Sequence, residues 1–87
     1  MIITDYLRYR AMLRGFGLDD IEEIVRYSSE RYVDTVTGRK VVVGRHGDIL
    51  VMIPYEIEGD SMVPITIHTT TRHHVKFRIK VGRFAYE

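Results

Sequence analysis

Three glycine-centred turn signals divide the middle of the chain into short β-branched runs, and this spacing limits the possible folds more than any other feature. The turns fall at Thr37-Gly38, His46-Gly47-Asp48 and Glu58-Gly59-Asp60, because glycine adopts the backbone conformations that tight turns require. The runs beside them predict strands at 32–36, 40–44, 49–57 and 63–69. Strands joined by short turns pair antiparallel, so we expect a three- to four-stranded antiparallel meander. Pro54 lies inside the longest run and indicates an edge, a bulge or a strand end there.

Two helices are expected before the strands. Thr4 or Asp5 can cap the first helix, and Gly15-Phe16-Gly17 ends it because glycine suits helix C-termini. Asp19 is expected to begin and cap the second helix, with Glu22 three residues later in a capping-box arrangement. Helices that come first and strands that follow are typical of the α+β class. At 87 residues the chain is expected to form one domain, residues 1–87.

The basic C-terminal segment fits two local structures. Four apolar residues alternate with basic ones, which is the pattern of a strand; they are Val75, Phe77, Ile79 and Val81. A helix is supported by Thr71 as an N-cap, by the four-residue spacing of Val75 and Ile79, and by Gly82 just after the last turn. We expect a C-terminal helix here, with a strand as the alternative.

Composition excludes several classes of protein. The chain has no cysteine, so it has neither a disulfide framework nor a thiolate metal site, and we expect a cytoplasmic protein. Its apolar runs are too short for a membrane-spanning helix, and the N-terminus lacks the apolar core of a signal peptide. We therefore expect no membrane partner. No phosphate-binding glycine loop or zinc-protease motif is present, and we expect no cofactor.

Positive charge concentrates in the C-terminal part of the chain. Residues 64–87 contain five basic side chains against the single acid Glu87; the five are Arg72, Lys76, Arg78, Lys80 and Arg83. Such a patch can bind phosphate, although a solvated surface accounts for it equally well. Arg45 and His46, in a turn between strands, join the same patch if the sheet brings them there. Phe84 and Tyr86 can either stack on bases or close the core.

Three histidines lie within seven residues, at positions His68, His73 and His74. Histidine titrates near neutral pH, so acid–base chemistry is a plausible function for them. A metal site needs three or four converging ligands, and adjacent histidines on one element usually point in different directions, so we predict no metal site. A surface histidine without a function is the alternative for each.

Two segments of the chain resemble a known family. Residues 13–25, LRGFGLDDIEEIV, resemble the helix–turn–helix that opens small BrnT-like domains and related members of the toxin superfamily that includes RelE. Residues 67–84, with the pattern T-x-R-x-x-x-x-x-R-I-x-x-G-R-F, are similar to the ending of uncharacterised prokaryotic members of that group. The order of elements is similar across nearly the whole chain. The resemblance implies a single RelE-like α+β domain with a final helix.

The resemblance also implies an activity, that of a metal-independent endoribonuclease toxin paired with a small antitoxin protein. Such an enzyme activates the RNA 2′-hydroxyl to attack the adjacent phosphate, which needs a base, an acid and cations. On this hypothesis His68 or His73 is the base or acid, and Arg72, Arg78 and Arg83 stabilise the phosphate; Tyr55 is a further candidate. The nucleic-acid contacts would be extended by Lys76, Lys80, Arg45 and His46.

Two other functions are compatible with the same residues. A non-catalytic module could bind nucleic acid or protein through the basic segment, and it would show salt-sensitive binding without cleavage. A homo-oligomer could form by pairing an exposed sheet edge. The arrangement of His68, Arg72, His73 and Arg83 relative to Arg45 and Tyr55 is the observation that separates these hypotheses.

Overall fold

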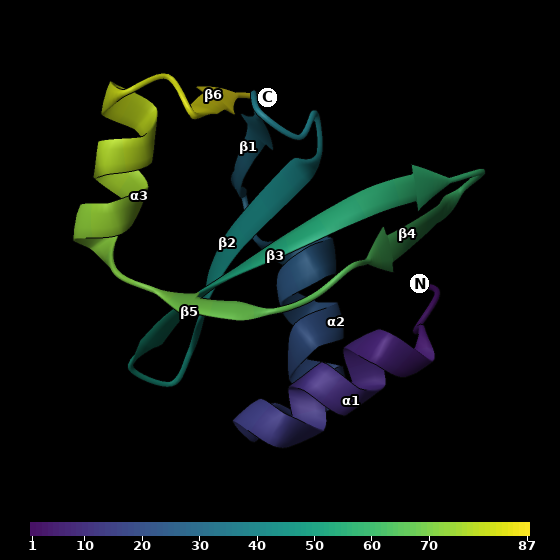
Figure 1. Cartoon of the computed structure of the whole chain (residues 1–87). Helices are drawn as coiled ribbons and strands as arrows, with labels where there is room; N and C mark the ends of the chain where they lie inside the picture. The colour runs from purple at the N-terminus through teal and green to yellow at the C-terminus, as the bar shows by residue number, and fades with distance from the viewer.

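The computed structural model describes residues 1–87 (Figure 1). Two helices come first, an antiparallel sheet follows, and a third helix precedes a short last strand. The elements are α1 Asp5–Arg14, α2 Leu18–Tyr27, β1 Glu30–Asp34, β2 Lys40–His46, β3 Ile49–Glu58, β4 Ser61–Pro64, β5 His68–Thr70, α3 Arg72–Lys80 and β6 Phe84–Tyr86. The α+β class and the order of helices, meander and C-terminal helix are therefore confirmed.

The caps of α1 and α3 form as the sequence predicts. The Thr4 hydroxyl accepts a hydrogen bond from the Leu7 amide at 3.1 Å, and Gly15 ends α1 with a φ of 75°. At α3 the Thr71 hydroxyl accepts from the His74 amide at 3.1 Å, and Gly82 follows the last turn with a φ of 79°. Only glycine adopts this left-handed conformation without steric cost. Residues 72–80 are a helix, as expected, and the strand alternative is wrong.

The expected cap of α2 is wrong. Asp19 does not cap the helix, because α2 begins one residue earlier at Leu18 and its N-cap is Gly17, which has no side chain to accept a hydrogen bond. Leu18 packs against the core between helices and sheet, and this tertiary contact draws it into the first turn. Asp19 and Asp20 instead lie in that turn, where their charge favours the positive end of the helix dipole.

The sheet is larger than the expected meander. Its strands run in the order β4-β3-β2-β1-β6, and β5 pairs with the other half of β3. The predicted strand at 63–69 is therefore two strands, and the chain bends between them at 65–67. Pro54 lies opposite this break, since its carbonyl accepts from the Ile65 amide at 2.8 Å. The carbonyl and the amide of one strand residue point to the same side of the strand. The side of β3 on which Pro54 lacks an N–H therefore faces the break between β4 and β5, so no hydrogen bond between strands is lost.

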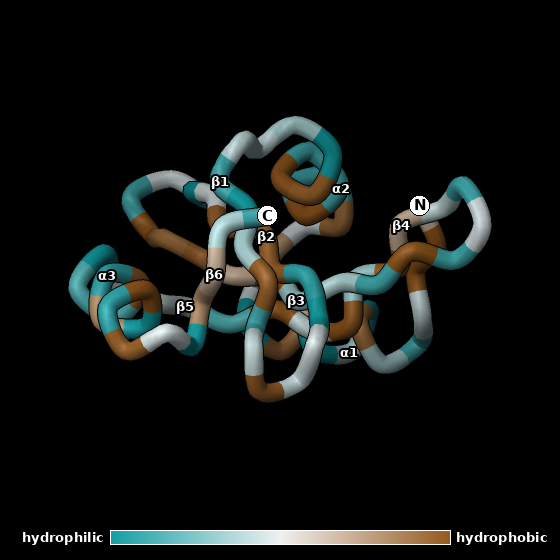
Figure 2. Tube along the Cα trace, turned by 90° about the horizontal axis from the view of Figure 1, so that it is seen from above, coloured by the Kyte–Doolittle hydropathy of each residue, from teal (hydrophilic) through white to brown (hydrophobic).

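Helices cover the two faces of the sheet unequally. One core lies between the sheet and the pair α1 and α2, and it contains Leu7, Ile21, Val42 and Tyr55 among its buried residues. The other core is smaller and lies between α3 and the opposite face of the sheet, to which β6 contributes Phe84. Figure 2 shows apolar colour along β2, whereas α2 and α3 each carry both apolar and polar colours. None of the helices has the length and apolar character needed to cross a bilayer.

A glycine in β2 allows α2 to lie close to the sheet. A Cβ atom on Gly44 would stand 2.6 Å from Cγ2 of Ile24, which is closer than two carbon atoms can approach. We expect Gly44→Ala to lower the free energy of unfolding by about 1–3 kcal/mol, because overpacking forces side chains or backbone to shift. Urea denaturation monitored by circular dichroism measures this change.

A second variant tests whether Ile24 is the cause. In the Gly44→Ala background, Ile24→Ala removes the clashing atoms, so the two substitutions should together cost less than the sum of their separate effects. Additive costs would show that the helix approaches the sheet for another reason.

Candidate functional site

A cleft of about 460 Å³ lies on the α3 face of the sheet, between α3, the β1–β2 turn and the β4–β5 junction. We call it the basic cleft. Its polar lining comes from four separate stretches of the chain and consists of Asp34, Arg39, Thr66, His68, Arg78 and Arg83, with the hydroxyl side chains of Thr37 and Thr69 beside them. The sequence predicted three of these residues as functional: His68, Arg78 and Arg83.

His68 reaches the cleft because of the register of β5. It pairs with Met52 of β3, and residues directly opposite in a sheet point to the same face. Met52 packs against the core under α3, so the half-buried imidazole of His68 lies on that face too. A strand one residue out of register would have turned His68 to the other side of the sheet.

The pKa of His68 is lowered from its usual value. Burial is the main cause, because it disfavours the imidazolium, and the positive charges of Arg14, Arg10 and Arg78 add to the effect. The neutral imidazole is therefore the dominant form near pH 7. A neutral imidazole can accept a proton, which is what a general base requires.

Arg83 is held in place by Asp34 at the end of β1. The Asp34 carboxylate accepts from Arg83 Nε at 2.9 Å and from the amides of Val36 and Thr37 at 2.9 and 3.2 Å. Burial raises the pKa of Asp34, but the hydrogen bond from Arg83 and those from the two amides outweigh it and lower the pKa overall. Asp34 therefore stays ionised, and the terminal amino groups of Arg83 make no hydrogen bond within the chain.

Arg78 is the least neutralised cation of the cleft. Its guanidinium lies 5.3 Å from the ring centroid of Phe84, a cation–π geometry that orients it without cancelling its charge. No carboxylate pairs with it. Phe84 is buried and stacks on Tyr32 with centroids 5.3 Å apart, so of the two roles expected for Phe84, closing the core is the one the structure shows.

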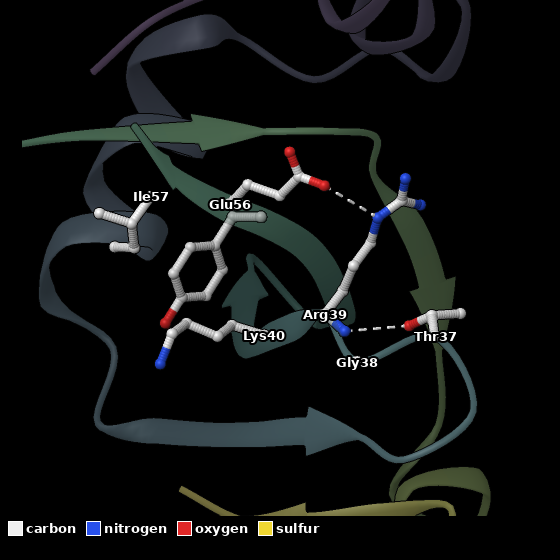
Figure 3. Close-up of a pocket in the computed structure, with 7 residues that line it drawn as sticks. Thr37, Gly38, Arg39, Lys40, Glu56 and Ile57 are labelled. Atoms are coloured by element: carbon white, nitrogen blue, oxygen red, sulfur yellow. Dashed lines mark hydrogen bonds and ion pairs between the residues drawn. The ribbon is translucent and has the colours of Figure 1, made fainter. Parts of the chain in front are cut away.

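Arg39 and Thr66 complete the lining. Arg39 Nε pairs with Glu56 at 3.3 Å, in the neighbouring depression on the β1–β2 turn and β3 (Figure 3), so its charge is partly neutralised. Thr66 is buried, and its hydroxyl has no hydrogen-bond partner within the chain. A buried polar group without a partner is costly, so the Thr66 hydroxyl is a polar group beside the cleft that the fold itself leaves unsatisfied. The sequence carries no local signal for Thr66, because the bend at 65–67 follows from the separate pairing of β4 and β5 with β3. Arg39 was not predicted either, because nothing in the β1–β2 turn sequence shows that it faces the cleft.

Arg72 and Arg45 lie on the same face of the sheet but outside the basic cleft. The Arg72 guanidinium makes two hydrogen bonds to the Glu30 carboxylate, one of them at 3.0 Å. Burial raises the pKa of Glu30, but the hydrogen bonds from Arg72 and Tyr32 outweigh it, and the charges of Arg72 and Arg45 lower the pKa further. Arg72 is thus engaged in joining α3 to β1, which the sequence did not predict.

His73, Lys76 and Lys80 are exposed on α3 and do not line the basic cleft. The ring of His73 lies 6.2 Å from that of His74. Lys76 and Lys80 therefore add positive charge to the helix that borders the cleft, and none of the three side chains contacts its interior.

Tyr55 and His46 lie on the opposite face of the sheet. Tyr55 is buried in the core under α1 and α2, and its hydroxyl accepts from Arg31 Nη1 at 3.0 Å. His46 Nε2 lies 3.1 Å from Asp20 Oδ2, and its ring packs edge-on against Phe16. Both residues hold structural contacts, and neither can reach a ligand bound in the basic cleft.

No group of three or more His, Cys, Asp or Glu side chains is arranged to hold a metal ion. No family model matches the sequence, and neither the curated proteins nor the solved structures contain a significant match. The arrangement of His68, Arg78 and Arg83 therefore carries the functional argument by itself. A proton acceptor beside two guanidinium groups is suited to binding and transforming a phosphate ester.

Proposed function

We propose that this protein is a metal-independent endoribonuclease of the toxin type that acts on RNA in the basic cleft. The observation that carries the proposal is the convergence of His68, Arg78 and Arg83 from β5, α3 and the segment before β6. The resemblance to RelE- and BrnT-like toxins implies the same activity and a small antitoxin protein as partner. The absence of cysteine suits a cytoplasmic setting.

The reaction that fits these groups uses the RNA itself as nucleophile. His68 accepts the proton of a 2′-hydroxyl, the 2′-oxygen bonds to the adjacent phosphorus, and the bond to the 5′-oxygen breaks. The leaving 5′-oxygen takes a proton from water at the open side of the cleft. Arg78 and the terminal amino groups of Arg83 stabilise the charge on the phosphoryl oxygens. The products are a 2′,3′-cyclic phosphate and a 5′-hydroxyl end.

A cleavage assay in the presence of EDTA tests the proposal. We expect the purified protein to cut a single-stranded RNA oligonucleotide into pieces with 2′,3′-cyclic phosphate ends, and to leave the matching DNA intact because it lacks the 2′-hydroxyl. The DNA should still compete for binding, and binding should weaken as salt rises.

Two outcomes decide against cleavage. Salt-sensitive RNA binding without any cut would identify the non-catalytic binding module, since the charged groups would then serve binding alone. The absence of both binding and cleavage across several RNA sequences would remove nucleic acid as the ligand.

A further inference from the structure

A second, more apolar depression of about 310 Å³ adjoins the basic cleft. It is lined by His74, Phe77, Arg78, Val81 and Arg83, so it shares both Arg78 and Arg83 with the basic cleft. The two guanidinium groups therefore border both depressions. A phosphate held by Arg78 and Arg83 would have the basic cleft on one side and this depression on the other.

The apolar side chains of the depression are exposed for no structural reason. Phe77 on α3 is 56% exposed, and Val81, the C-cap residue just after α3, is 57% exposed. They lie four residues apart, about one helical turn. The buried residue of α3 is Val75, which packs into the core on the other side of the helix. The Phe77 ring has no aromatic or cationic partner within the chain, so one of its faces is available for stacking.

We infer that this depression is a nucleobase subsite, which takes an unpaired base next to the phosphate bound by Arg78 and Arg83. The inference rests on the proposed function and adds that the substrate is single-stranded. Phe77 would stack on the base, since every base has a π-face. His74, three residues before Phe77 on the same helical face, would lie along the edge of the base.

The surroundings favour a base over a protein segment. α3 contains no acidic residue, and the positive charges at the depression suit a ligand whose phosphate lies beside its apolar part. The lining of five residues fits one flat ring, whereas an amphipathic helix would need a longer groove. Continuity with the basic cleft through Arg78 and Arg83 places base and phosphate at neighbouring positions, as in a nucleotide.

Binding of an uncleavable single-stranded RNA tests the subsite. The probe is an oligonucleotide with 2′-O-methyl groups and one 2-aminopurine, whose fluorescence reports stacking. We expect Phe77→Ala to raise the Kd about 5- to 100-fold, because base–aromatic stacking contributes that much to affinity, and to remove the fluorescence change. Phe77→Trp should preserve both, whereas Phe77→Leu, which keeps the apolar volume, should not.

A matched control is Tyr6→Ala on α1, because Tyr6 is also 56% exposed but lies on the helix that covers the opposite face of the sheet. It should leave RNA binding unchanged. Thermal melting checks that each variant is folded, as expected for substitutions at exposed positions.

An abasic probe distinguishes the subsite from a general effect. If Phe77 stacks on the base, removing that base should abolish the effect of Phe77→Ala. Unchanged affinity of Phe77→Ala in a protein that still binds RNA through Arg78 overturns the subsite and leaves the proposed function standing. The subsite is also overturned if Phe77→Ala loses binding to an acidic protein but keeps its affinity for RNA. Failure of the wild-type protein to bind any RNA overturns both the subsite and the proposed function.

Discussion

Replacing His68 with glutamine is expected to lower the rate of RNA cleavage about 100- to 10,000-fold, the usual contribution of a general base. Glutamine fills a similar volume and keeps a polar end at the first residue of β5, but it cannot accept a proton from a 2′-hydroxyl. The Kd for an uncleavable RNA should change little, because the positive charges of the cleft remain. Single-turnover cleavage with a labelled oligonucleotide measures the rate.

The pH dependence of the wild-type rate gives an independent test of His68. Burial and the nearby arginines lower the pKa of His68 below the usual histidine value of 6.5, and the base form is the active one. The cleavage rate should therefore rise from acid pH, reach half its plateau below pH 6.5, and stay level through neutral pH. We call this rise the acidic limb of the pH–rate profile. His68→Gln should lack it.

His73→Gln serves as the matched control, because His73 is exposed on α3 outside the cleft. It should retain the wild-type rate and the acidic limb. If His73→Gln lost all activity and His68→Gln stayed active, His73 on α3 would be the general base, and the proposed mechanism would be wrong.

Replacing Arg78 with alanine is expected to lower the cleavage rate about 100- to 1,000-fold, as is typical when one group that stabilises transition-state charge is lost. Arg78 suits this test because no carboxylate pairs with it, so its removal leaves no unpaired buried acid. Arg83→Ala would be harder to interpret, because it also frees the Asp34 carboxylate that holds the β1–β2 turn. Arg78→Lys, which keeps the charge without the planar fork, should give an intermediate rate.

Arg78 and His68 should also be coupled through charge. The positive charge of Arg78 contributes to the low pKa of His68, so Arg78→Ala should raise that pKa and move the acidic limb of the rate to higher pH. Arg8→Ala removes an equal charge from an exposed position on α1 and should leave both rate and limb unchanged. Equal losses in Arg78→Ala and Arg8→Ala would mean that net charge, not the cleft, determines activity.

The local backbone structure could be predicted from the sequence. Thr4, Gly15, Thr71 and Gly82 mark the ends of α1 and α3 because a hydroxyl cap or a left-handed glycine acts on the nearest few residues alone. The same is true of the turns that separate β1 to β4. For α2 this local reasoning failed at Asp19, because the packing of Leu18 against the core moved the start of the helix.

Only the tertiary structure decided which candidate residues meet. His68, Arg78 and Arg83 share a cleft because β5 pairs in one register with β3 and β6 pairs with β1, whereas Tyr55 faces the other core and Arg72 is paired with Glu30. The sequence by itself determined the helices, the turns and the basic C-terminal segment, since these depend on neighbouring residues. It could not determine the cleft or its unpartnered Thr66 hydroxyl, because strand pairing between distant segments sets which face each side chain occupies.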